Sequence, residues 1–273
     1  MKFGSTEIEL LADGSFTLEV GACFGVVPRK IWSRVVKENE NNRVRMALNI
    51  PLIKAHGWSA LIDTGVGSRP DERMKKIYEI EKETDLMRQV ENSIGQENVD
   101  YIVHSHLHFD HMGHSFETAD GRVSFPNAVR VAQKDEYHNF RNTNEVTRGS
   151  YLSNVSLDGR FNMSEISGSV RIRDGLRVVK TGGHTSGHQA IIYENGGKGL
   201  IYFGDIVPST FNLKLPYITA IDTFPLDTLE MKKSLFKLAI EKQYVCVFNH
   251  DSQVKTAYLK GDVNNIEIEP VEL

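Results

Sequence analysis

The residues with the clearest chemistry lie in one short run, His104-Ser105-His106-Leu107-His108-Phe109-Asp110-His111. His106 and His108 stand two apart after an apolar stretch that predicts a strand, so their imidazoles leave the extended backbone on the same side and can share one metal ion. Asp110 and His111 follow where we expect a turn into a short helix, which can aim both side chains at a second position. The run therefore predicts two neighbouring metal sites. His104 has the same spacing from His106 and competes as a ligand.

Four ligands cannot complete two metal sites, because zinc takes about four ligands at roughly 2.0 to 2.2 Å and a catalytic zinc leaves one position for water. Three more candidates, His184, Asp205 and His250, each stand where a predicted strand gives way to a loop. The predicted metal ligands are therefore His106, His108, Asp110, His111, His184, Asp205 and His250. Such donors suit zinc first, and also iron, manganese or cobalt, and we expect two divalent metal ions per chain.

The other histidines and the two cysteines have ordinary structural explanations. His114 and His188 are expected to support ligands or to lie on a helix face, while His56 lies in a predicted turn and His138 on the surface. The cysteines at positions 23 and 246 form no CxxC pair and stand in apolar stretches, so we expect both to be reduced packing residues.

Length and charge exclude several classes of protein. The chain has 273 residues, enough for a sizeable core, and its 40% hydrophobic and 25% charged residues are ordinary for a globular protein. The 32 Lys and Arg against 36 Asp and Glu give a net charge of −4 without a basic cluster, so nucleic acid is not an expected partner. No apolar run has the length of a membrane span or the form of a signal peptide, and we expect a cytoplasmic protein without a membrane partner.

The pattern of elements predicts one domain over residues 1–273. Strands are expected at 8–11, 16–20, 46–53, 59–63, 99–103, within 122–133, and at 170–172, 176–180, 189–194, 199–203 and 244–248, and helices at 84–94 and 226–241. Many short strands and few long helices predict packed sheets covered by helices. Residues 21–25 are expected to form a glycine-rich turn. Residues 141–162 are polar and without a clear period, which predicts a surface excursion.

The order HxHxDH, then His, Asp and His, resembles the metallo-β-lactamase superfamily. The resemblance covers nearly the whole chain and implies an α/β-class fold, a four-layer αββα sandwich of two mixed sheets flanked by helices. The segment 61–65 is similar to a family motif at the end of an early strand, so Asp63 is implied to be a buried support for the metal ligands. Several segments resemble, more narrowly, the quorum-quenching N-acyl homoserine lactonase and methyl parathion hydrolase branch: 24–30, Trp32, 105–111, 125–128 and 204–208.

The ligand set and this resemblance together imply a binuclear metallo-hydrolase. A hydroxide bridged, like Asp205, between two cations would be a nucleophile at neutral pH, since the metals lower the pKa of water from about 15.7 to near 7. The metal held by His106, His108 and His184 is expected to polarise the substrate carbonyl, with Asp110 as the proton carrier. The expected substrate is a lactone. An organophosphate or other ester hydrolase is the alternative, and a metal-binding regulatory protein without turnover is a further one.

Apolar side chains in residues 206–224 predict a loop that walls a pocket for a lipophilic small molecule. The pocket residues predicted from this loop and from the N-terminal part are Phe24, Trp32, Phe211 and Tyr217. Such an apolar segment can instead pack against a second copy of the chain, so a homodimer is also possible. Lactonases of this branch have a tyrosine where position 208 is Pro, and Tyr217 is a candidate replacement.

Overall fold

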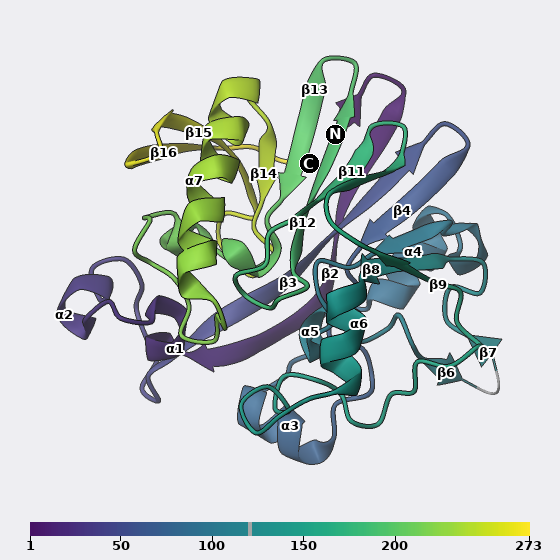
Figure 1. Ribbon diagram of the computed structural model, residues 1–273, viewed down its shortest axis with the longest axis horizontal. Coiled ribbons are helices and arrows are strands. Elements are labelled where there is room, and N and C mark those ends of the chain that lie inside the picture. The colour runs from purple at the N-terminus through teal and green to yellow at the C-terminus, as the bar shows by residue number, and fades with distance from the viewer. Residues whose placement is uncertain (120–121) are drawn as a thin grey trace.

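The computed structural model describes residues 1–119 and 122–273 and contains two seven-stranded mixed sheets (Figure 1). The order across the first sheet is β1 (Lys2–Phe3), β2 (Thr6–Glu19), β3 (Arg43–Ala55), β4 (Trp58–Ile62), β5 (Tyr101–Val103), β8 (Val129–Gln133) and β9 (Met163–Ile166). Strands β1 to β4 pair antiparallel, whereas β4, β5, β8 and β9 pair parallel. A separate two-stranded sheet pairs β6 (Thr118–Ala119) with β7 (Arg122–Val123).

The second sheet follows the order of the chain. Its strands are β10 (Val170–Arg173), β11 (Leu176–Lys180), β12 (Gln189–Asn195), β13 (Lys198–Tyr202), β14 (Val245–Val247), β15 (Thr256–Asp262) and β16 (Asn265–Pro270). Only β13 and β14 pair parallel among them, because α7 (Pro225–Lys242) connects the two strands as a crossover.

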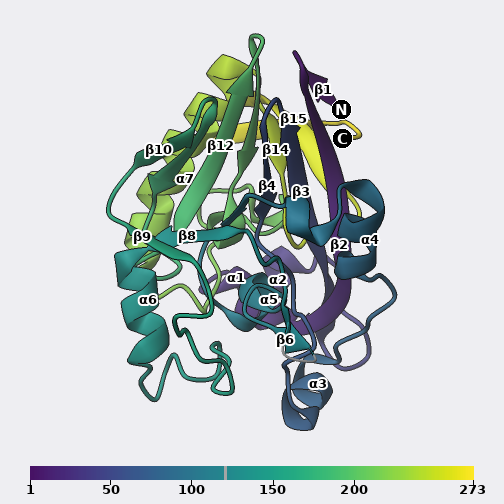
Figure 2. The ribbon, with the colours of Figure 1, turned by 90° about the vertical axis from the view of Figure 1, so that its right-hand side faces the viewer.

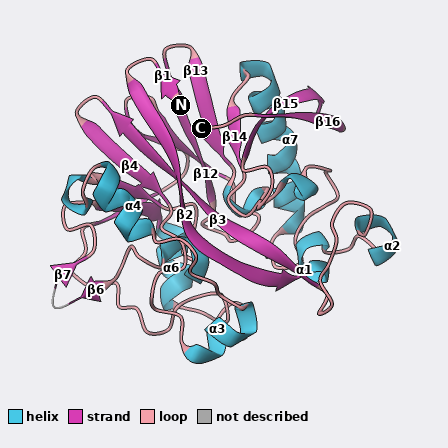
Figure 3. Ribbon diagram, turned by 180° about the vertical axis from the view of Figure 1, so that it is seen from behind, coloured by secondary structure: helices cyan, strands magenta, loops and turns pink. Residues whose placement is uncertain are grey.

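The remaining helices are short and lie at the ends and faces of the sheets (Figures 1 and 3). They are α1 (Val20–Phe24), α2 (Arg29–Trp32), α3 (Glu72–Tyr78), α4 (Leu86–Ser93), α5 (Phe109–Met112) and α6 (Lys134–Arg141), with 3-10 turns η1 (Gln96–Asn98), η2 (Gly204–Ile206) and η3 (Thr210–Asn212). No helix in the described residues is long and apolar enough to cross a bilayer.

Alternating side chains build a four-layer structure. Ala60 and Ile62 of β4 pack between the sheets, whereas Leu61 packs against α4 on the outer face of the first sheet. In the second sheet Leu200 packs between the sheets, whereas Ile201 packs against α7. Figure 2 shows the two sheets face to face, with α4 and α7 on opposite outer sides. The predicted sandwich of two mixed sheets flanked by helices is confirmed.

Some local predictions were wrong, and each has a physical reason. The two strands expected at 8–11 and 16–20 are one strand, β2, because Asp13-Gly14 forms a bulge opposite β3 instead of a turn. The expected turn at 21–25 is mostly helical, as α1. Helices α3 and α6, which are short and rich in charged residues, and the strand pair β15–β16 were not predicted.

A buried charge network joins the β2 bulge to the loops that follow β4 and α5. Asp13 Oδ2 accepts hydrogen bonds from Val66 N at 2.9 Å and Lys82 Nζ at 2.7 Å, and Asp13 Oδ1 lies 3.0 Å from His114 Nε2. His114 Nδ1 is 2.9 Å from Glu117 Oε2. Burial lowers the pKa of His114, but hydrogen bonds and charge attraction from Asp13 and Glu117 outweigh burial and raise it to about 9.

This network predicts a pH-dependent contribution to stability. Because the pKa of His114 rises from 6.5 to about 9 on folding, its stabilisation is complete below pH 6.5 and is lost as the pH rises through about 9. His114→Gln should therefore be less stable than the wild type by up to about 3 kcal/mol near pH 6, with a gap that shrinks toward pH 9.5. Denaturant unfolding across this pH range measures the gap. His56→Gln, at an exposed turn, is the control for the loss of an imidazole, and a pH-independent gap for His114→Gln would contradict the network.

Candidate metal centre

All seven predicted ligands lie where strands of the two sheets end, and none is more than 7% exposed. The loop before α5 and α5 itself carry His106, His108, Asp110 and His111, and β11, β13 and β14 are followed by His184, Asp205 and His250. Figure 2 shows α5 beneath the ends of both sheets. The layered fold thus brings together residues that are up to 144 positions apart, the distance in sequence between His106 and His250.

Three imidazoles form a first set, which we call the imidazole group: His106, His108 and His184. The ring centroid of His106 lies 4.4 Å from that of His108 and 4.7 Å from that of His184, and His184 Nε2 is 3.1 Å from His108 Nδ1. Burial and the neighbouring imidazoles lower the pKa of His106 and His108 well below the usual value. Both rings are therefore neutral, which is the form that binds a metal ion.

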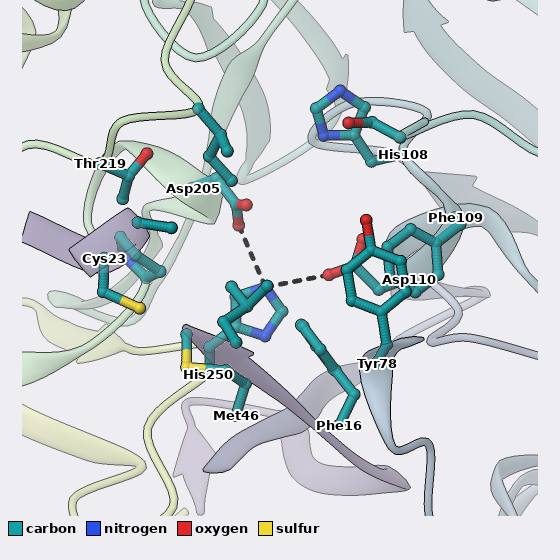
Figure 4. Close-up of a pocket in the computed structure, with 15 residues that line it drawn as sticks. Phe16, Cys23, Met46, Tyr78, His108, Phe109, Asp110, Asp205, Thr219 and His250 are labelled. Carbon is teal, nitrogen blue, oxygen red and sulfur yellow. Dashed lines mark ion pairs between the residues drawn. The ribbon is translucent and has the colours of Figure 1, made fainter. Parts of the chain in front are cut away.

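A carboxylate and two imidazoles form a second set, the mixed group: Asp110, His111 and His250. Asp110 Oδ2 lies 3.3 Å from His250 Nε2 and 3.6 Å from His111 Nε2, and Figure 4 shows the first of these pairs. Burial lowers the pKa of His111, but the surrounding carboxylates, with Asp205 foremost, outweigh burial and raise it well above the usual value. Negative charge is therefore concentrated where the imidazole nitrogens converge, and this arrangement suits a divalent cation.

Asp205 lies between the two groups and directs one oxygen to each. Its Oδ2 is 3.4 Å from His184 Nε2 in the imidazole group. Its Oδ1 is 3.2 Å from His111 Nε2 and 3.3 Å from His250 Nε2 in the mixed group. A carboxylate in this position can serve as a ligand to both groups at once.

Unpartnered nitrogen atoms test whether metal ions fit these residues. Within the described residues, the buried Nε2 atoms of His106, His111 and His250 have no hydrogen-bond partner of acceptable geometry. A buried polar atom without a partner costs about 1 to 3 kcal/mol. Each of the three belongs to a group of donors whose ligand atoms lie within 4.8 Å of one another. The donor set and its unpartnered nitrogens fit two cations.

Asp63 lies directly behind the ligands, with its carboxylate buried. Its Oδ2 accepts hydrogen bonds from His111 Nδ1 at 2.8 Å, Ser105 Oγ at 2.7 Å and Tyr202 Oη at 2.8 Å, and its Oδ1 accepts one from Ser105 N at 2.7 Å. Burial raises the pKa of Asp63, but His111 and His104 outweigh burial and lower it. An ionised Asp63 fixes the His111 tautomer so that Nε2 points to the centre.

Two more ligand imidazoles are fixed in the same way. His184 Nδ1 lies 2.9 Å from Oδ1 of Asp222, a buried carboxylate that also accepts hydrogen bonds from Thr219 and Thr228. His250 Nδ1 is 2.8 Å from the carbonyl oxygen of Ala47. Each contact directs Nε2 of the ring toward the centre.

Asp205 is held by its backbone and by an amide. Its N–H donates to His188 Nε2 at 3.0 Å, and Asn249 Nδ2 donates to its Oδ1 at 2.6 Å. The chain can approach His188 this closely because residue 204 is glycine, with φ +56°. A Cβ there would lie 2.5 Å from His188 Nε2. The predicted supporting role of His188 is therefore consistent with its place behind Asp205.

Several assignments differ from the sequence-based expectations. His104 lies outside both the imidazole group and the mixed group, and its Nε2 is 2.9 Å from Ser115 Oγ. Asp222 and Asn249 were not predicted as supports. Asn249 directly precedes the predicted ligand His250, so its closeness to the centre could have been predicted. Asp222 lies in the loop 206–224, which was predicted to wall a substrate pocket because of its apolar residues.

A small cavity of about 60 Å³, which we call the apolar cavity, opens on Asp110, Asp205 and His250 (Figure 4). Its wall is otherwise mainly apolar and comprises Phe16, Leu18, Ala22, Cys23, Met46, Tyr78, His108, Phe109, Ser150, Pro208, Thr219 and Ile221. Burial and the nearby Asp110 raise the pKa of Tyr78, so its hydroxyl stays protonated. The cavity offers a compact space next to the ligands.

The four predicted pocket residues do not line this cavity. The ring of Phe24 stacks on Trp32 at 5.8 Å and contacts Phe211 at 5.3 Å and Tyr217 at 5.4 Å, all within one buried cluster that includes Cys23. They pack against one another behind Cys23, which is part of the wall. The tyrosine on the wall is Tyr78 of α3.

The family model described as Metallo-beta-lactamase superfamily matches residues 49–250, a span that contains all seven candidate ligands. The chain belongs to the metallo-beta-lactamase superfamily. The superfamily resemblance predicted from the sequence is thereby confirmed.

Similar proteins within the superfamily include lactonases. An N-acyl homoserine lactonase from Bacillus sp is 26% identical over 174 residues, which cover 62% of this chain and 63% of that protein. The crystal structure of a probable metal-dependent hydrolase from Staphylococcus aureus has a TM-score of 0.92 at 28% identity and covers 100% of this chain and 99% of its own. A dizinc quorum-quenching lactonase has a TM-score of 0.78 at 19% identity and covers 100% and 97%, a likeness of fold.

Asp63→Asn should lower zinc affinity roughly 10- to 100-fold. The neutral amide lacks the negative charge that stabilises a proton on His111 Nδ1 and so keeps Nε2 directed to the centre. Competition with a chromogenic chelator measures the affinity. Asp100→Asn is the matched control, since Asp100 also accepts a backbone hydrogen bond, from Ser59, but lies away from the centre. Equal affinities for wild type and Asp63→Asn would contradict the supporting role.

Proposed function

We propose that this chain is a metal-dependent hydrolase that cleaves an ester-like carbonyl, and a lactone in particular, with two divalent cations. The observation that carries the proposal is the position of Asp205, whose two oxygens face separate groups of nitrogen and oxygen donors. Zinc suits these donors first, while iron, manganese and cobalt also accept them.

Cations at these groups would polarise a carbonyl oxygen and make water nucleophilic at neutral pH. The residues of the chain supply the rest. The imidazole group and the mixed group fix positions on either side of Asp205, and the apolar cavity admits the part of the substrate next to the carbonyl while it excludes bulk water. Asp110 lies at the cavity wall, and burial raises its pKa. We assign to Asp110 the transfer of a proton to the leaving oxygen.

Two observations favour a lactone over other ester-like substrates. The relatives described above include an N-acyl homoserine lactonase and a dizinc quorum-quenching lactonase. The apolar cavity is also small, and a compact ring presents its carbonyl with little bulk around it. An organophosphate remains the alternative substrate that the same assay tests.

Removal of metal should abolish hydrolysis, and restored activity should track metal content. The zinc-loaded protein is expected to contain two metal ions per chain and to cleave lactones faster than thioesters, β-lactams and phosphotriesters. Elemental analysis gives the metal content, and a substrate panel with and without chelator gives the rates. Glu267→Gln, an exposed substitution on β16, is the control and should keep the metal content and the activity of the wild type. Full activity with one ion per chain, or turnover that survives chelation, would contradict the proposal.

Chain length should affect turnover only until the apolar cavity is filled. For lactones with increasing alkyl substituents, each added methylene should raise kcat/KM up to about fourfold, because burying a methylene is worth about 0.8 kcal/mol, and the series should then level off. Leu18→Ala enlarges the cavity and should move the plateau to longer chains. Leu226→Ala, at an exposed position outside the wall, is the matched control. A flat series would show that the cavity does not hold the substituent.

A further inference from the structure

A second and larger cavity of about 550 Å³ adjoins the metal centre, and we call it the polar groove. Its wall comprises His108, Asn139, Asn142, Asn144, Val146, Thr147, Ser150, Tyr151, Thr185, Ser186, Ala220, Ile221, Asp222, Thr223 and Phe224. The volume lies within the range of small-molecule sites, whereas the apolar cavity has room only for a compact group. Most of the space for a ligand is therefore in the polar groove.

The polar groove and the apolar cavity share part of their walls. Both are lined by His108, Ser150 and Ile221. Ser150 is fixed beside the ligand residues, because its carbonyl oxygen accepts a hydrogen bond from Phe109 N at 2.8 Å. Among the described residues its hydroxyl makes no hydrogen bond, and the residue is half-buried at the junction. A ligand that occupies both cavities would lie against the three shared residues, of which Ser150 is the one with a free hydroxyl.

The groove wall mixes polar and apolar groups and is richer in polar groups than the wall of the apolar cavity. Amide and hydroxyl side chains dominate it, and none of the described residues that line it is Lys or Arg. Both carboxylate oxygens of Asp222 are already hydrogen-bonded, to His184, Thr219 and Thr228. An anionic group in the groove would therefore meet no side chain of opposite charge. An uncharged group would meet Ser150 Oγ, Asn142 Oδ1 and Asn144 Nδ2, which make no hydrogen bond among the described residues.

The polar side chains of the wall are held in place by bonds to their own neighbours. Asn139 Nδ2 donates to Ser186 Oγ at 2.9 Å, which joins α6 to the loop that carries His184. Asn144 Oδ1 accepts from the backbone N–H of residues 146 and 147, and Asn142 Nδ2 donates to the carbonyl of His138. Ordered groups lose less entropy when they bind a ligand, so such a wall is suited to recognition.

We propose that the polar groove is a second substrate subsite that binds an uncharged moiety with several hydroxyl or amide groups, and that Ser150 is the residue that contacts this moiety at the junction. The inference rests on the proposed function, because it places the carbonyl in the apolar cavity. The substrate is then amphipathic, with a compact apolar part beside the metal centre and a larger polar part in the groove.

Two non-hydrolysable lactams of equal length test this subsite without turnover. One lactam carries an alkyl side chain and the other a polyhydroxylated side chain, and calorimetry measures the Kd of each for the zinc-loaded full chain. The wild type should bind the hydroxylated lactam at least about tenfold more tightly, since each hydrogen bond contributes a few-fold. Ser150→Ala and Asn142→Leu should each weaken the hydroxylated lactam about three- to tenfold and the alkyl lactam less than about twofold. Glu145→Gln, on the same segment but outside the wall, is the control.

The outcomes separate this subsite from the proposed function. Equal affinities of the wild type for the two lactams, equal losses of both in Ser150→Ala, or no binding of either lactam would overturn the subsite. A protein that hydrolyses lactones but shows no preference between the lactams keeps the proposed function and loses the subsite. A preference for the hydroxylated lactam that Ser150→Ala removes, in a protein that cleaves no lactone, supports the subsite and rejects the lactone.

Discussion

The whole arrangement depends on one shared carboxylate, that of Asp205. Buried imidazoles and carboxylates lose their hydration, and only a closely placed counter-charge can offset that cost. Burial raises the pKa of Asp205, but His111, His250 and His184 outweigh burial and keep it well below the usual value, so the carboxylate remains ionised between the two groups. Several of the nitrogens around it have no hydrogen-bond partner among the described residues. A pair of cations would bind the nitrogens and the carboxylate together. This explains why so many polar side chains converge at a buried site.

The strand-end loops can meet at Asp205 because other buried carboxylates hold their backbones. Glu136 of α6 accepts hydrogen bonds from Leu107 N at 3.0 Å and Thr185 Oγ1 at 2.6 Å, so it ties the loop of His106 and His108 to the loop of His184. Asp63 and Asp222 do the same for other ligands through direct contacts with their rings. The loops are therefore fixed by electrostatic contacts behind the site. The apolar cavity and the polar groove lie on the other side of the ligands.

The sequence predicted the layers of the fold, and which histidines and aspartates converge, better than the residues of the cavity wall, and the reason is physical. Ligand spacing such as that of His106 and His108 is a local property, and strand ends are visible as breaks in apolar runs, so both can be read along the chain. The position of Phe24 depends on which of several aromatic residues packs behind the cavity wall, and this is decided only when distant segments meet. Asp222 was missed for the same reason, since its partner His184 lies 38 residues away. Short, charged helices such as α3 were missed because tertiary contacts, rather than periodicity, stabilise them.

Anomalous diffraction from crystals of the zinc-loaded protein, recorded at the zinc absorption edge, tests the role of Asp205 most directly. The account predicts two anomalous peaks per chain, one at the imidazole group and one at the mixed group, with Asp205 Oδ2 bound to the first ion and Oδ1 to the second. A single fully occupied peak in an active crystal, or two peaks of which only one contacts Asp205, would contradict it.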